Sequence, residues 1–300
     1  MDYMTVLHNA LRFLACAVLA AIQAGMPVSG QVFQLSAEQL KRYTAANPYD
    51  RFPDGRPKVP DEILEKVRGL SAEEVFGIER RGYPNQFENH WQILHPDKKL
   101  VGRALTLQLM PLRPDVADVD GTGLPFSSPR GRHITHQTAI DLLQPGDVLV
   151  VDAHSIPGGI IGDNLGFYIY KKAAGFVIDG AVRDLDGLKE FDVAGYFREA
   201  VPSYLTSCMV TGINIPVQIG KATVMPGDVV FGDSEGVYFI PPQLVKDIVD
   251  RADETHVHDE WTKKKFEGGN YKSTDIYPRP SDPVLQKEYE QYLKSHSVPR

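Results

Sequence analysis

Short apolar runs alternate with segments of helical periodicity between about residue 70 and residue 253. Runs of this length, bounded by Gly, Pro and Asp, are typical of strands. The expected strands are 103–110, 147–152, 175–179 and 237–240, and the expected helices are 36–45, 71–81, 135–143, 164–174, 243–253 and 283–295. This alternation predicts the α/β class, with a layered α/β/α-type core built on short strands.

The sequence PGDV occurs twice, at 145–148 and at 226–229, each time before an apolar run. Proline fits the second position and glycine the third position of a type II turn. Both turns are therefore expected to lead strands into one core. The recurrence alone does not establish a duplication, because a turn followed by a strand also recurs by chance.

An apolar run with small residues behind it follows Arg12 near the N-terminus. This order is typical of a secretory signal peptide, with cleavage expected after Gly30, and the run is too short for a stable membrane span. Residues 1–30 are therefore predicted to be a cleaved signal, which would make the protein secreted or periplasmic. If they form an N-terminal helix instead, we expect a cytoplasmic protein.

The remaining chain divides by composition into a central region and two flanking segments. Residues 31–68 mix a short helix with a Pro-rich stretch and read as an N-terminal extension. Residues 69–253 hold the alternating strands and helices, including a long loop at 111–132 that is rich in Pro, Gly and Asp. Residues 254–300 are polar and rich in turns, so we expect a helical C-terminal extension.

Composition and charge narrow the class of protein. Hydrophobic residues make up 42% and charged residues 24% of the 300 residues, which is typical of a globular protein, and the net charge is −7. The chain has no excess of basic residues that would favour a nucleic-acid partner. Of the two cysteines, Cys16 lies in the predicted signal and Cys208 lies in an apolar, strand-like setting. Cys208 is therefore expected to be a buried thiol rather than a nucleophile.

The stretch 158–184 (GGIIGDNLGFYIYKKAAGFVIDGAVRD) carries the most chemical information. Its first glycine turn offers backbone N–H groups that can hold an anion. The predicted strand 175–179 ends in another glycine turn, which delivers Arg183 and Asp184 to the edge of the sheet where α/β proteins bind ligands. A fixed cation beside a hard oxygen ligand suits a small carboxylate bound next to a divalent metal. Taken separately, the glycines also fit a plain tight turn and the Arg-Asp pair a surface ion pair.

This stretch, together with MPGDVVFGDSEGVYFIP at 225–241 and LVGRALTLQ at 100–108, resembles the family of the regulator of ribonuclease activity A. That family includes the 4-hydroxy-4-methyl-2-oxoglutarate aldolases. The resemblance covers roughly residues 69–252. It implies a swivelling-domain-like α/β core, and a homotrimer or hexamer with sites near subunit interfaces.

The resemblance also implies a chemistry and assigns its residues. A small 2-oxo acid would bind to the amides of Gly159, Ile160, Ile161 and Gly162 and to Arg183, and Asp184 would hold Mg²⁺ or Mn²⁺. The implied reaction is that of a metal-dependent lyase, which cleaves a 4-hydroxy-2-oxo acid or decarboxylates oxaloacetate through a pyruvate enolate. Arg183 and an acid would carry the catalysis.

One position departs from the aldolase pattern. The aldolases have an acidic residue at the spacing from the Arg-Asp pair where this chain has Gly162. Asp163, the next residue, would take the catalytic acid's place if the connection to the strand is one residue shorter. Otherwise the chain fits a second interpretation, in which a non-catalytic binding or regulatory protein retains the fold.

Several other polar groups are candidates for functional roles. They are His133, His136 and His154 as acid–base groups or ligands, His256 and His258 as a ligand pair, Asp233 and Glu235 in a turn, and Glu88, His90 and Trp91 in a pocket or subunit interface. For the histidines and for the turn acids, a structural or solvated role is the favoured interpretation. For Glu88 and its neighbours, neither interpretation is favoured.

Overall fold

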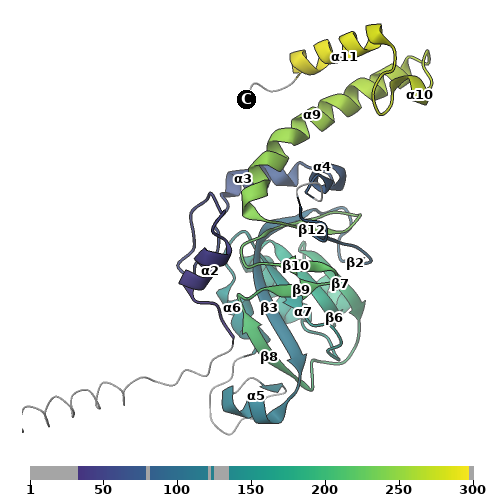
Figure 1. The fold of residues 1–300 in the computed structure, drawn as a ribbon. Helices are drawn as coiled ribbons and strands as arrows, with labels where there is room; N and C mark the ends of the chain where they lie inside the picture. The colour runs from purple at the N-terminus through teal and green to yellow at the C-terminus, as the bar shows by residue number, and fades with distance from the viewer. Residues whose placement is uncertain (1–32, 79–81, 121–122, 125–134, 297–300) are drawn as a thin grey trace, which may run out of the picture. The chain divides into compact units, whose positions relative to one another are not determined.

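The structure is a computed structural model that describes residues 33–78, 82–120, 123–124 and 135–296 (Figure 1). Its helices are α2 (Ala37–Tyr43), α3 (Asp61–Arg68), α4 (Ala72–Phe76), α5 (Pro114–Asp120), α6 (His136–Leu142), α7 (Asp163–Lys172), α8 (Leu185–Leu188), α9 (Pro242–Glu267), α10 (Ser273–Ile276) and α11 (Pro283–His296). Its strands are β1 (Phe87–Glu88), β2 (Gln92–Ile93), β3 (Leu100–Pro111), β4 (Gly123–Leu124), β5 (Asp147–Asp152), β6 (Gly175–Val182), β7 (Ala194–Ala200), β8 (Cys208–Ile213), β9 (Val217–Ile219), β10 (Ala222–Val224), β11 (Val229–Gly232) and β12 (Val237–Ile240). The predicted signal segment 1–30 lies outside the described residues.

A curled mixed sheet organises the described strands. Its order is β1-β12-β11-β3-β5-β6-β7-β2, and β8 with β4 is paired to the far end of β3. The strands β3, β5, β6 and β7 run parallel, so the carboxyl ends of β5, β6 and β7 meet at one edge. The α/β class predicted from the sequence is confirmed, and this shared edge is where both polar clusters described below are found.

The long strand β3 contributes to cores on both faces of the sheet. Val101, Leu105 and Leu107 point to the face that carries the helices, whereas Leu100 and Ala104 point to the opposite face. On the helix-bearing face, α6, α7 and α8 cover the parallel strands and α3, α4 and α9 cover β11 and β12. On the opposite face, the β9–β10 hairpin closes the core.

The segment before residue 69 packs into this core. Val59 and Leu64 are buried against Val101 of β3. Arg56, which is 1% exposed, forms an ion pair with the buried Asp147 at the start of β5 (Nη2 to Oδ2, 3.2 Å). The domain boundaries expected near 68 and 253 stay predictions, but the Pro-rich stretch that reads as an extension contributes both buried apolar and buried charged side chains.

Local signals placed several helix starts correctly. Capping boxes at Ser36, Ser71 and Thr135 begin α2, α4 and α6, because each side chain accepts from an N–H in the first helical turn. The expected helix 71–81 is shorter than predicted, since Gly77 ends α4 and residues 79–81 lie outside the described part. The expected loop 111–132 contains α5 and β4, and residues 125–134 are not described.

The ends of two further expected elements are wrong. The predicted strand 175–179 does not end in a turn at Gly180 but continues to Val182, with one extra residue against β7 between Ile178 and Ala181. The predicted helix 243–253 continues to Glu267, because its polar second half contains neither Pro nor Gly before Gly268. The second half of α9 packs Trp261 against Leu285 of α11 in a small separate cluster.

Candidate functional site

The glycine turn lies directly against the end of β6. Gly159 forms a parallel bridge with Ala181, and its N–H donates to the carbonyl oxygen of Ser203 at 2.8 Å. A Cβ built on Gly159 would lie 2.7 Å from Cβ of Arg183. Any side chain at this position would displace Arg183, so the close approach of loop and strand requires glycine.

Some backbone N–H groups of the turn already donate hydrogen bonds within the protein. The N–H of Ile160 donates to the carbonyl oxygen of Ala181 at 2.8 Å, and the Gly159 N–H is used as described above. Within the described residues, no acceptor is bonded to the N–H groups of Ile161, Gly162 or Asp163, where α7 begins. Substrate binding at 159–162 stays a prediction, and the amides open to an anion are those at the N-terminal end of α7.

Arg183 and Asp184 form an ion pair immediately after β6. Their side chains are 36% and 37% exposed, so the pair adds little to stability and both groups can reach a ligand. Asp184 has a left-handed backbone, with φ of 54°. Such conformations cost free energy in residues other than glycine and are concentrated at functional sites. The Asp184 carbonyl accepts the Leu188 N–H at 3.0 Å, which begins α8.

Gly162 occupies the position where the aldolases carry an acid, and the structure leaves no space there for a side chain. A Cβ built on Gly162 would overlap Oδ2 of Asp184 and lie 3.0 Å from Cζ of Arg183. An acid at this position would therefore require the Arg183–Asp184 pair to move. The position of the Arg183–Asp184 pair in this chain is therefore compatible with glycine at 162 and not with an acidic residue there.

Asp163 follows as the first residue of α7. Gly162, not Asp163, is the N-cap residue of the helix. Oδ1 of Asp163 accepts from the Asn164 N–H at 2.7 Å. The side chain lies against α8, where a Cβ built on Gly187 would be 2.9 Å from Cβ of Asp163. A role for Asp163 as the catalytic acid stays a prediction.

The described residues contain no group of three or more His, Cys, Asp or Glu side chains arranged to hold a metal. Asp184 nevertheless offers one exposed carboxylate beside solvent. Mg²⁺ is commonly held in proteins by one or two carboxylates and keeps several water ligands, and Mn²⁺ prefers the same oxygen donors. Asp184 therefore fits a hydrated divalent ion for which the protein supplies few direct ligands.

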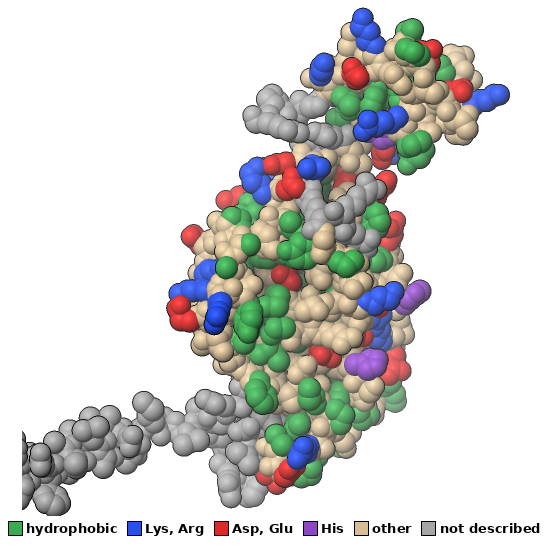
Figure 2. Space-filling view, viewed as in Figure 1, with side chains coloured by type: hydrophobic (Ala, Val, Ile, Leu, Met, Phe, Trp, Pro, Cys, Tyr) green, Lys and Arg blue, Asp and Glu red, His purple; other side chains and the backbone are tan. Residues whose placement is uncertain are grey.

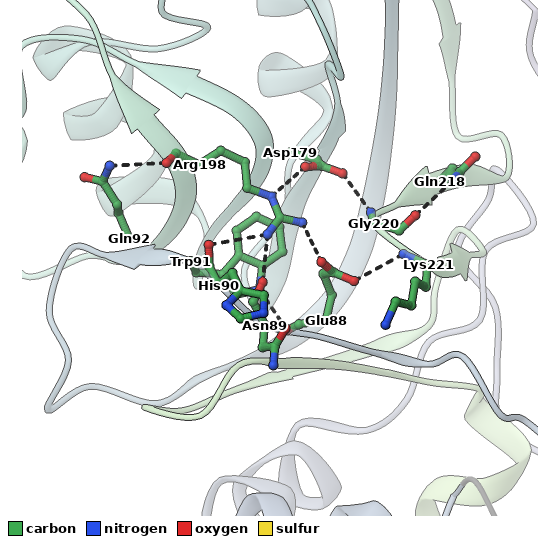
Figure 3. Close-up of polar contacts among 10 residues, drawn as sticks. All are labelled: Glu88, Asn89, His90, Trp91, Gln92, Asp179, Arg198, Gln218, Gly220 and Lys221. Carbon is green, nitrogen blue, oxygen red and sulfur yellow. Dashed lines mark hydrogen bonds and ion pairs between the residues drawn. The ribbon is translucent and has the colours of Figure 1, made fainter.

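A second polar cluster lies at the same edge of the sheet, on the face that carries the β9–β10 hairpin (Figure 3). Nε of Arg198 donates to Asp179 at 2.7 Å and Nη2 donates to Glu88 at 3.0 Å. The Arg198 guanidinium also lies over the Trp91 ring, 3.7 Å from its centroid. The cluster joins β6, β7 and the segment around β1.

This cluster borders a cavity of about 390 Å³. The cavity is lined by Glu88, Asp152, His154, Asp179, Arg198, Gln218 and Gly220. The pocket interpretation of Glu88 is thereby supported, whereas Asp152, Asp179, Arg198 and Gln218 were not predicted as site residues. A signal for two of them was present, because Asp179 and Arg198 each interrupt an apolar strand, and a charge in such a place needs a partner.

The remaining candidates from the sequence have structural surroundings. Cys208 is fully buried, and burial raises the pKa of its thiol to about 11, which confirms a buried thiol. Burial lowers the pKa of His136 to about 4, so its imidazole is neutral. His133 lies outside the described residues.

The histidines of α9 and Asp233 in the β11–β12 turn each contact another element of the fold. Nδ1 of His256 lies 2.9 Å from Glu74 Oε1, and Nδ1 of His258 lies 2.8 Å from the Tyr289 hydroxyl. The Asp233 carboxylate accepts the Ala72 N–H at 3.1 Å, at the start of α4. The contact of Asp233 agrees with the structural role favoured from the sequence, whereas the two histidines, expected in a solvated segment, lie on α9.

On the face shown in Figure 2, acidic and basic side chains are interspersed between hydrophobic ones. Within the described part of the chain, no helix has both the length and the apolar character needed to cross a membrane.

Comparison with known proteins identifies the family. The family model described as RraA-like, Aldolase/RraA, matches residues 67–239. A protein of Halalkalibacterium halodurans, provisionally named a 4-hydroxy-4-methyl-2-oxoglutarate aldolase, is 33% identical over 118 residues, covering 39% of this chain and 56% of the relative. A protein of Ectopseudomonas mendocina with the same provisional name is 31% identical over 107 residues, covering 35% of this chain and 66% of the relative. The chain thus spans less than two thirds of these relatives.

A solved structure of another protein supports the same family assignment. Streptomyces coelicolor RraAS2, described as an unusual member of the RNase ES inhibitor RraA protein family, superposes with a TM-score of 0.59 at 28% identity. The superposition covers 72% of this chain and 99% of that chain. The family resemblance expected from the residues at 158–184 is confirmed, and the chain belongs to the RraA-like family.

Proposed function

We propose that this protein is a lyase that cleaves a carbon–carbon bond of a small 2-oxo acid through a pyruvate enolate. The observation that carries the proposal is the contact between the glycine turn and the exposed Arg183–Asp184 pair at the end of β6. Free amides, a guanidinium and a carboxylate meet there within one small region. This donor set matches the carboxylate and keto oxygen of a 2-oxo acid.

In the proposed complex, the substrate carboxylate accepts from the amides of Ile161 and Gly162 at the start of α7, where the helix dipole favours an anion. Arg183 donates to the keto oxygen and stabilises the negative charge that develops on it. Asp184 would hold Mg²⁺ or Mn²⁺, which supplies a Lewis-acid charge when bound.

The electron balance defines what the protein must provide. In retro-aldol cleavage, the 4-hydroxyl loses its proton and becomes a carbonyl, and the electrons of the C3–C4 bond pass into the enolate. In decarboxylation of oxaloacetate, the same enolate forms as CO₂ leaves. Asp163, at the edge of the site, is the proposed group that moves the proton. The provisional names of the relatives favour a 4-hydroxy-2-oxo acid as substrate.

A second function is a binding or regulatory role without catalysis. The likeness to the Streptomyces coelicolor protein, described as a member of an RNase inhibitor family, is the observation that favours it. The two functions differ in one respect that can be measured, because a regulator does not turn over a 2-oxo acid.

The test is pyruvate release by the purified full chain, with Mg²⁺ or Mn²⁺ and with oxaloacetate or 4-hydroxy-4-methyl-2-oxoglutarate as substrate. We expect metal-dependent turnover, and a loss of at least about 100-fold in kcat/KM in Asp184→Ala and in Arg183→Ala. Asp186→Ala, which removes a neighbouring exposed acid from α8, is the matched control and should keep wild-type rates. Wild-type activity in Asp184→Ala, or no turnover of either substrate, would contradict the proposal.

A further inference from the structure

We propose that the cavity beside Arg198 is a second small-molecule site, selective for an organic cation that carries an ammonium group. Its volume of about 390 Å³ is in the range of small-ligand pockets. None of its lining residues belongs to the glycine turn or to the Arg183–Asp184 pair. The inference is therefore independent of the proposed lyase activity.

The cavity has the position of a ligand site in this fold class. Asp152 is the last residue of β5, Asp179 lies at the register shift of β6, and Arg198 lies near the end of β7. The hairpin residues Gln218 and Gly220 form the facing wall. Ligands of α/β proteins bind outside the carboxyl ends of parallel strands, which is this edge.

One part of the lining is a fixed frame. The two oxygens of Asp179 accept from Arg198 Nε and from the Gly220 N–H, both at 2.7 Å. The two oxygens of Glu88 accept from Arg198 Nη2 at 3.0 Å and from the Lys221 N–H at 3.2 Å (Figure 3). Arg198 Nη1 donates to the Asn89 carbonyl at 2.7 Å. The charge of Arg198 is therefore matched by two carboxylates, and each of its three nitrogens already donates within the frame, so the guanidinium is a poor site for an anion.

The other part of the lining has unused acceptors. Oδ2 of Asp152 accepts from the Gln218 N–H at 3.3 Å, whereas Oδ1 has no hydrogen bond to any described residue. Nε2 of Gln218 donates to the Gly220 carbonyl at 2.9 Å, and Oε1 accepts no hydrogen bond from any described residue. His154 is exposed and makes no hydrogen bond within the described part of the chain. A ligand that binds here must therefore supply hydrogen-bond donors for these acceptor groups.

Charge decides which donor-bearing ligand is favoured. Three carboxylates and one guanidinium line the cavity, so its net charge is −2 when His154 is neutral. A partly enclosed negative site attracts a cation more strongly than a neutral hydroxyl compound, and it repels an acid. An ammonium group supplies both the positive charge and the N–H donors for Asp152 and Gln218.

Three compounds with the same four-carbon skeleton separate these cases. Calorimetry at low salt with the full chain should give a Kd on the order of 0.1–1 mM for butane-1,4-diamine. Butane-1,4-diol and succinate should bind at least about tenfold more weakly. Equal binding of the diol, preferential binding of succinate, or no saturable binding of the diamine would overturn the proposal.

Two variants locate the binding site. Asp152→Asn removes the charge and replaces one acceptor oxygen by an NH2 donor, and His154→Arg places a second cation at the exposed rim, where folding is not at risk. Each should weaken diamine binding by about tenfold or more. Asp184→Asn removes a carboxylate from the other cluster and should leave the Kd unchanged. Wild-type affinity in both pocket variants, with thermal unfolding showing that both are folded, would also overturn the proposal.

Discussion

Asp147 and Asp228 occupy the same place in two turns of the same local geometry. Gly146 and Gly227 have φ of 80° and 89°. In each turn the aspartate N–H donates to the carbonyl oxygen three residues earlier, at 2.9 Å for Asp147 and 3.1 Å for Asp228. One carboxylate oxygen in turn accepts the N–H of that same earlier residue, at 3.0 Å and 2.8 Å.

The two turns differ in what the neighbouring chain supplies. Arg56 forms an ion pair with Asp147, whereas within the described residues no Lys or Arg is paired with Asp228. Burial also raises the pKa of Asp147, where Arg56 opposes the shift, and it raises the pKa of Asp228 to about 7. Pro57, the residue after Arg56, lies against Gly227. The local motif therefore determines the turn, whereas the distant segment around Arg56 determines whether the buried aspartate has an opposite charge beside it.

The largest expected effect comes from removing the partnered aspartate. Asp147→Ala leaves the Arg56 guanidinium buried without its main partner and should lower the free energy of unfolding by about 3–5 kcal/mol. Urea unfolding measures the loss. Asp186→Ala, at an exposed position, should change stability by less than about 0.5 kcal/mol. A loss in Asp147→Ala as small as in this control would show that Asp54, which also pairs with Arg56, suffices as its partner.

The unpartnered aspartate should appear in the pH dependence of stability. The folded pKa of Asp228 is about 7 and the ordinary value is 3.8, so between these values the folded state holds a proton that the unfolded state releases. Its contribution to stability is fully present below about pH 4 and is lost as the pH rises to about 7.

Asp228→Asn removes this titration and keeps an acceptor for the Met225 N–H. The stability of the variant relative to wild type should therefore increase between about pH 4 and pH 8, by up to about 4 kcal/mol. Unfolding curves at several pH values measure it, with Asp147→Asn as the comparison, where Arg56 opposes the effect of burial and the increase should be smaller. Parallel profiles for Asp228→Asn and wild type would show that Asp228 is charged in the folded protein.

The smallest expected effect is the difference in stability between alanine substitutions at Gly146 and at Gly227. Alanine at either position has an unfavourable positive φ, at a cost of about 1–2 kcal/mol. At Gly227 the new Cβ also overlaps Pro57 Cδ and lies 2.9 Å from its backbone nitrogen, whereas at Gly146 it meets the end of the Arg103 side chain at 2.6 Å. Gly227→Ala should therefore be less stable than Gly146→Ala by about 1 kcal/mol.

Gly82→Ala provides the baseline for this pair, since Gly82 has φ of 87° and open space around its Cβ position. Thermal unfolding of the three variants separates the backbone cost from the contact cost. If Gly146→Ala and Gly227→Ala were equally stable, the packing of Pro57 on the second turn would not limit substitution.

Local signals in the sequence were sufficient for much of the fold. The strand 147–152 was predicted with the bounds that the structure has, because a Pro-Gly turn and an apolar run define both of its ends. The end of α9 was missed because polar residues suggested a loop, although helix formers continue to Gly268. The position of β3 between β11 and β5 could not be predicted, because strand order depends on contacts between distant segments.

The two polar clusters also differ in how far the sequence could predict them. The glycine turn, Arg183 and Asp184 are close in the chain and could be recognised as a motif. Arg198 and Glu88 are separated by 110 positions and meet only because β7 and the segment around β1 converge beside β6. A buried charge in an apolar strand indicates that a partner exists, but the sequence does not say which residue it is.

The extra residue in β6 has a consequence for how this family's motif can vary. Side chains alternate along a strand, so removing Gly180 at this register shift would turn Arg183 toward the opposite face of the sheet. The same deletion would leave Asp179 and its partner Arg198 in place. The candidate site therefore depends on the number of residues between Asp179 and Arg183 as well as on their identity. A relative could lose the site through a deletion in this stretch while Asp179, Arg183 and Asp184 are all retained.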